Sequence, residues 1–179
     1  MTHGMYHPIT QCKLSAGMDA QGKLQALHMR ISGQSILAGL FPQNVRDGKD
    51  PVVFQGLNNG GGEAMIGYTV PNLLIDHAMR NPHVPPGFWR GVNLNQNAIY
   101  LESFIDELAH ATRQDPLALR RKLMAKHPKH LAVLNAVAED HGLPIVVSTH
   151  PRTQKRVDAT GAQFHPLVRL MKPLGFHDY

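Results

Sequence analysis

The first third of the chain alternates apolar and polar residues, which is the period of a β-strand with one buried face. Strands are predicted over residues 9–16 and 24–31, with turn-forming residues between them at 19–22. One side of the second strand carries three large apolar residues, Leu27, Met29 and Ile31. The pattern therefore predicts a hairpin that buries one face.

The next stretch, residues 39–62, is rich in Pro, Gly, Asn and Asp, and it is predicted to be mostly loop. Its triple glycine at 60–62 lacks the strand-to-helix setting of a phosphate-binding loop, so we interpret it as a turn. Two more short strands are predicted over residues 64–70 and 73–79.

From Asn97 the apolar residues recur at steps of three and four, which predicts an amphipathic helix to about residue 111. Asn95 or Asn97 is expected to cap it. The Asp-Pro pair at 115–116 has the residue types favoured at an N-cap and at the first helical position, so a second helix is predicted over residues 117–126. A third helix is predicted over residues 128–139.

The pattern of apolar residues changes again after residue 142. Residues 143–148 are continuously apolar and β-branched, as in a strand buried within a parallel sheet, and a turn at 149–153 leads to a short helical segment at 154–159. No partner strand is found for it. The predicted class is α+β: a β-hairpin and short strands followed by three helices, with a C-terminal β/α (Rossmann-like) fragment, and a domain boundary between residues 139 and 140.

Composition narrows the class of protein. The chain has 179 residues, of which 42% are hydrophobic, so it can bury a core. No apolar run approaches the roughly 18 residues of a membrane span, and the first residues lack an export-signal pattern. The net charge is +5, but the basic residues are dispersed on predicted helix faces that point to solvent, which argues against nucleic-acid binding. The densest group is Arg120, Arg121, Lys122, Lys126 and Lys129.

Two residue types were weighed as reactive or metal-binding groups. Cys12 is the only cysteine and lies in a predicted strand without a His or Asp partner, so we interpret it as a buried structural thiol. His127 and His130 have helical i,i+3 spacing, but no carboxylate or thiolate nearby completes a zinc site. Neither is expected to bind a metal.

The segment 84–97 carries the densest candidate site. Prolines stiffen its start, two glycines allow close backbone approach, and the only tryptophan lies beside an arginine. In one interpretation Trp89 stacks on a flat ligand and Arg90 meets an oxygen or phosphate. In the other, Trp89 is a core residue and Arg90 pairs with Glu102 or Asp106.

The stretch PGFWRGVNLNQNAIYLESFIDELAHATRQDPLALRR resembles the molybdopterin-binding large subunit of xanthine dehydrogenase/aldehyde oxidase-type molybdenum hydroxylases. The shared order is an aromatic-Arg-Gly loop, a Gln five residues later, a helix with Asp-Glu-Leu-Ala, and then Asp-Pro and Arg. Residues 2–139 as a whole resemble the isoquinoline 1-oxidoreductase β branch of this family.

This resemblance implies a molybdenum-molybdopterin cofactor, oxidation of small molecules with water, and electron transfer to an iron–sulfur partner subunit. It implies cofactor contacts at Arg90, Gly91 and Gln96, and substrate-facing aromatic rings at Phe88 and Trp89. The loop departs from the xanthine dehydrogenase pattern at Val92 and at residues 94–95, which argues against purines and favours an aldehyde or N-heterocycle.

Two family segments are not found: the Gly-rich, Phe-containing loop and the segment with the catalytic Glu. No residue is therefore assigned as catalytic, and Glu63 is interpreted as a surface acid. The chain is expected to be a fragment that is inactive alone. We expect a cytoplasmic protein, or a periplasmic one if a preceding segment carries an export signal.

Residues 140–179 resemble a different family, the non-hydrolysing UDP-N-acetylglucosamine 2-epimerases, through LPIVVSTHPRTQKR. His150 and Arg152 match that family's His-Pro-Arg turn and are the alternative site. The chain is therefore interpreted as a chimera joined near the third helix. The rival functions are an epimerase fragment that binds a UDP-sugar and a non-catalytic interaction module.

Overall fold

The computed structural model describes residues 6–58, 66–140, 145–148, 159 and 168–171. The chain divides into two compact units, Met1–Ile66 with Val70–Phe104, and Gly67–Thr69 with Ile105–Tyr179. The predicted boundary after residue 139 stays a prediction. Among the described residues, no helix combines the length and the apolar character needed to cross a membrane.

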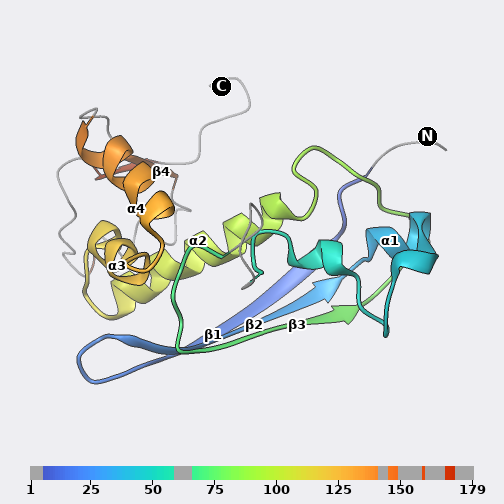
Figure 1. The fold of residues 1–179 in the computed structure, drawn as a ribbon, viewed down its shortest axis with the longest axis horizontal. Coiled ribbons are helices and arrows are strands. Elements are labelled where there is room, and N and C mark those ends of the chain that lie inside the picture. Colours follow the sequence, from blue (N-terminus) through green and yellow to red (C-terminus); the bar gives the residue numbers. More distant parts are fainter. Residues whose placement is uncertain (1–5, 59–65, 141–144, 149–158, 160–167, 172–179) are drawn as a thin grey trace. The chain divides into compact units, whose positions relative to one another are not determined.

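The first unit is built on a three-stranded sheet of β1 (Thr10–Met18), β2 (Leu24–Gly33) and β3 (Asn72–Met79), in the order β1-β2-β3 (Figure 1). β1 and β2 are antiparallel, which confirms the predicted hairpin, and β3 runs parallel to β2. The turn closes because the Asp19 carboxylate accepts the backbone N–H groups of Gln21 and Lys23.

The two faces of this sheet differ as the alternation predicts. Leu27, Met29 and Ile31 are at most 2% exposed, whereas the alternate residues of β1 are exposed. Complete burial of one such side chain stabilises a fold by about 1.5–3 kcal/mol. The buried face therefore supplies much of the core of the first unit.

The segment between β2 and β3 is mainly irregular, as predicted. It contains a short helix α1 (Ile36–Leu40) and two 3-10 turns, η1 (Pro42–Asn44) and η2 (Pro51–Phe54). The triple glycine at 60–62 and Glu63 lie outside the described residues. The predicted strand at 64–70 is wrong for residues 66–70, because the N–H of Thr69 donates to the carbonyl of Leu123, at a helix end, and not to a strand.

Three helices follow, as predicted: α2 (Leu94–Ala111), α3 (Pro116–Leu123) and α4 (Pro128–Asn135), the last continuing as a π-helical turn, Ala136–Asp140. Asp115 caps α3, because its carboxylate accepts the N–H of Ala118 at 2.7 Å. The predicted capping of α2 by Asn95 or Asn97 is wrong, since α2 begins at Leu94 and both residues lie within it.

The second unit buries apolar residues from the helices, namely Ile105, Leu108, Ala109, Leu117, Leu119, Leu123 and Ala138. The expectation that its basic residues all face solvent is wrong in part. The side chain of Arg120 is 14% exposed and pairs with Asp106, and Arg121 donates to the side-chain oxygen of Asn135. Lys122, Lys126 and Lys129 are exposed.

The tail strand has a partner, contrary to the sequence analysis. β4 (Ile145–Ser148) pairs in parallel with β5 (Val168–Met171). The second strand was missed because it is only four residues long and holds a central arginine, which hides its apolar character. Apart from Ala159, the predicted turn and helix at 149–159 lie outside the described residues, so the Rossmann-like character stays a prediction.

Candidate functional site

A tight turn at Trp89–Val92 leads into α2. The N–H of Val92 donates to the Trp89 carbonyl at 2.7 Å, and the N–H of Leu94 donates to the Gly91 carbonyl at 2.9 Å. Gly91 has φ 81° and Val92 has φ 49°. A β-branched residue in this left-handed region costs roughly 1–3 kcal/mol, and such strain is most often found at functional sites. The turn is therefore held by its surroundings and not by local preference.

Glycine is needed at position 91 because its φ is positive and because there is no room for a side chain. A Cβ atom at this position would lie 2.1 Å from Oδ1 of Asn95. The same Asn95 closes the turn, because its Nδ2 donates to the Arg90 carbonyl at 2.7 Å. Any larger residue would push Asn95 away and open the turn.

The aromatic and basic residues of the turn face outward. Trp89 is 56% exposed and Phe88 is 41% exposed, and the ring of Phe88 lies 6.3 Å from that of Phe41 between centroids. The interpretation of Trp89 as a core residue is therefore wrong. Arg90 is also exposed, and Asp106, one of its two suggested acidic partners, pairs instead with Arg120.

Beneath the turn, two buried asparagines fasten the start of α2 to η2. Asn93 and Asn97 are each 1% exposed. Nδ2 of Asn93 donates to the Val52 carbonyl at 3.0 Å, and Nδ2 of Asn97 donates to the carbonyls of Val53 and Gln55 at 2.8 and 3.0 Å. Buried amides that satisfy backbone carbonyls fix one position and one rotation of the helix end.

The η2 segment is itself fixed by a buried carboxylate. Asp50 is 0% exposed and accepts hydrogen bonds from the Ser35 hydroxyl, from the N–H of Leu37 and from the N–H of Val52. A chain of hydrogen bonds thus connects the start of α1, through η2, to Asn93 and the first turn of α2. Every link has a directional partner, which is what a rigid site needs.

Gln96 lies at the end of this chain. Its Nε2 donates to Oδ1 of Asn93 at 2.5 Å, whereas its Oε1 is buried and has no hydrogen-bond partner. A buried acceptor without a donor costs roughly 1–3 kcal/mol. The predicted site residue Gln96 therefore holds an unused acceptor a few residues after the exposed Trp89 and Arg90.

Sequence reasoning missed Asn93, Asn97 and Asp50. The signal was present for the asparagines, because they stand four residues apart and Asn97 is in line with the apolar positions Leu101 and Ile105. Polar residues at such positions are buried only when a partner is present, and that partner, residues 52–55, is distant in sequence. Asp50 gave a weaker signal, since Asp before Pro is common in loops.

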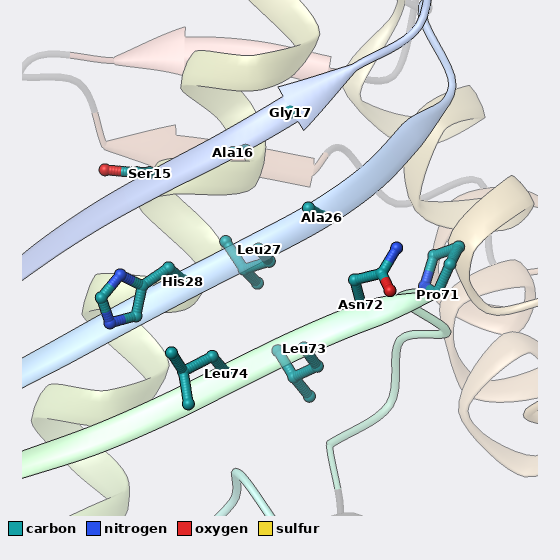
Figure 2. A pocket seen from close by; sticks show the side chains of 10 residues that line it. All are labelled: Ser15, Ala16, Gly17, Ala26, Leu27, His28, Pro71, Asn72, Leu73 and Leu74. Carbon is teal, nitrogen blue, oxygen red and sulfur yellow. The ribbon is translucent and has the colours of Figure 1, made fainter.

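A shallow depression lies elsewhere, on the more exposed face of the sheet (Figure 2). It is floored by small residues, Gly17 and Ala26, and edged by the 55%-exposed Leu74 and by His28. Nε2 of His28 lies 3.2 Å from an oxygen of Asp76. None of the predicted site residues lines it, so we do not assign the site there.

Two titratable groups of the sheet are shifted by burial. Partial burial raises the pKa of the Cys12 thiol to about 11. The thiol was expected to be buried, but it is only partly buried, and its low reactivity stays a prediction. Burial lowers the pKa of His77, while the Gly33 carbonyl and the charge of Asp50 oppose that shift. Both shifts favour the neutral form of the side chain.

The histidine pair weighed as a metal site, His127 and His130, lies at the start of α4. The rings of His127 and His130 meet edge to face, and Nε2 of His127 lies 3.1 Å from the Thr69 hydroxyl. Within the described part of the chain, no three His, Cys, Asp or Glu residues gather as metal ligands. The alternative site residues His150 and Arg152 lie outside the described residues.

Comparison with known proteins agrees with most of the resemblance stated for residues 2–139, up to residue 124. The isoquinoline 1-oxidoreductase subunit beta of Brevundimonas diminuta is 29% identical over 131 residues, which are 72% of this chain and 16% of that protein. A family model described as the molybdopterin cofactor-binding domain matches residues 1–124 and so includes the Trp89–Val92 turn and α2. The chain therefore belongs to the molybdopterin cofactor-binding domain family.

Proposed function

We propose that this chain forms one wall of the molybdopterin site of an oxidoreductase subunit that acts on an aldehyde or N-heterocycle. The observation that carries the proposal is the buried, unpartnered Oε1 of Gln96, which follows within a few residues the exposed Trp89 and the strained Val92. An acceptor left without a donor fits a ligand that brings one. The match of residues 1–124 to the molybdopterin cofactor-binding domain family supports molybdopterin as that ligand.

The residues of the turn suit different parts of such a ligand. The exposed guanidinium of Arg90 suits a phosphate or another anionic oxygen. The exposed rings of Phe88 and Trp89 suit a flat substrate. When bound, the cofactor supplies a metal centre for two-electron oxidation with water as the oxygen source.

The whole protein's activity needs more than this chain provides. The aligned residues are only 16% of the length of the curated relative, so a catalytic base and the electron path are proposed to lie on other segments and on an iron–sulfur partner subunit. The epimerase alternative and the chimeric origin stay predictions, because the family match ends at residue 124.

The test is to purify the chain anaerobically from a host that makes molybdopterin, and to measure bound molybdenum and, after oxidation, the fluorescence of bound pterin. We expect pterin to copurify with the wild type and with Leu74→Ala, which alters only the depression on the sheet. We expect Gly91→Ala to lose it. Equal pterin in all three proteins, or none in a folded wild type, would refute the proposal.

A further inference from the structure

The orientation of the Gln96 amide is set by the Val52 carbonyl through two hydrogen bonds in series, both made by the side chain of Asn93. The Val52 carbonyl can only accept, so the side chain of Asn93 must turn its Nδ2 toward it, and this bond measures 3.0 Å. Oδ1 of Asn93 then faces Gln96, which must answer with its Nε2, at 2.5 Å. Reversing either amide would place two donors or two acceptors in contact.

We infer that Asn93 is a positioning residue that makes Gln96 present its carbonyl oxygen to an N–H donor of the bound pterin. The inference rests on the proposed function. Because Nε2 of Gln96 is held by Asn93, Oε1 is the buried atom left without a partner. A carbonyl oxygen only accepts hydrogen bonds, and the pterin ring carries N–H donors, whereas an ionised phosphate offers mainly acceptors.

Asn97 provides a matched comparison for this role. It is the same residue type on the same helix end, and it is equally buried at 1% exposure. Its amide also donates to backbone carbonyls of the 52–55 segment, but no hydrogen bond joins it to Gln96. Loss of Asn97 should therefore weaken the anchoring of α2 without removing the partner that orients Gln96.

The first arm of the test uses the cofactor-free chain. Side-chain amide signals are recorded by NMR after selective ¹⁵N-glutamine labelling, and Gln96 is assigned by its absence in Gln96→Met. In Asn93→Leu the NH2 exchange of Gln96 should quicken by about tenfold, the effect expected for loss of one buried hydrogen bond. Asn97→Leu keeps Asn93 as the partner of Gln96 and should keep slow exchange.

The second arm measures pterin uptake in a double-mutant cycle. Gln96→Met removes the acceptor of the proposed hydrogen bond with the pterin, and Asn93→Leu leaves that acceptor without the partner that orients it. Each variant should therefore weaken cofactor binding by about tenfold. The double variant should bind no more weakly than Gln96→Met alone. Asn97→Leu removes part of the anchoring of α2 but not the partner of Gln96, so it should lower thermal stability, and any loss of uptake in the folded protein should add to that of Gln96→Met.

The outcomes separate the inference from the proposed function. Additive losses in the cycle, or equal quickening of exchange in Asn97→Leu and Asn93→Leu, would show that Asn93 only stabilises the fold, and would overturn the inference while leaving the cofactor site intact. Wild-type protein that is folded but takes up no pterin would overturn the proposed function, and the presentation of Oε1 with it. The exchange measurement would then still decide whether Asn93 orients Gln96.

Discussion

The two halves of α2 are held in different ways. At its first turns, the amides of Asn93 and Asn97 donate to backbone carbonyls of η2 and its neighbour Gln55. In its second half, Ile105, Leu108 and Ala109 are buried by apolar contact. Apolar burial is strong but has no direction, whereas hydrogen bonds fix rotation. The half with directional contacts is the half that carries Gln96, so stability and positioning are supplied by different parts of one helix.

The largest expected loss of stability comes from a substitution in the half of α2 that is held by apolar contact. Ile105→Ala removes a side chain that is 0% exposed and should lower the free energy of unfolding by about 2–5 kcal/mol in urea titrations. The surface control Ile99→Ala, at a residue 64% exposed on the same helix, should stay within about 0.5 kcal/mol. Comparable losses in both variants would mean that burial does not distinguish the two sides of α2.

The next effect concerns the turn that leads into the directional half. Gly91→Ala forces a side chain onto φ 81° and against Asn95, and should cost about 1–3 kcal/mol of stability as well as pterin binding. Gly48 is a matched control, because it has φ 70° but open space where a Cβ would stand. If Gly48→Ala costs as much stability as Gly91→Ala, the contact with Asn95 has no importance.

A smaller effect tests polar anchoring outside the site. Asp115→Ala removes the cap of α3 and should cost about 0.5–2 kcal/mol, measured by thermal or urea unfolding. Asp115→Asn retains an acceptor and should recover most of the loss. Pterin content should be unchanged in both folded variants, and a loss of pterin there would mean that positioning is not confined to the first turns of α2.

The smallest expected effect concerns the rate at which the Cys12 thiol is alkylated. The Cys12 thiol has a pKa of about 11, raised by burial, so alkylation by iodoacetamide should be slow at pH 8 and should rise about tenfold per pH unit until it levels off near pH 11. The folded pKa exceeds the unfolded value of 9.0. The contribution of the thiol to the free energy of unfolding is therefore unchanged below pH 9, falls as the pH rises from 9 to 11, and stays at its reduced value above pH 11. Levelling near pH 8.5 would show a solvent-exposed thiol.

The sequence was sufficient for elements whose signal is local. The hairpin, the apolar side of β2 and the Asp115 cap follow from alternation and from capping chemistry. It also supplied the Trp89, Arg90 and Gln96 candidates through resemblance. The burial of Asn93 and Asn97 could not be predicted from the sequence. Polar residues are expected to be exposed unless a partner is known, and their partners, residues 52–55, are distant in sequence. The partner strand β5 was missed because it is only four residues long and its arginine hides its apolar character.

The most direct test of a cofactor site at the turn uses Trp89, which is the only tryptophan in the chain. Its fluorescence is recorded during anaerobic titration with molybdopterin, together with its quenching by iodide before and after saturation. The account predicts that emission falls as pterin binds and that the 56%-exposed ring becomes protected from iodide. Pterin binding that leaves both the emission and the iodide quenching of Trp89 unchanged would contradict it.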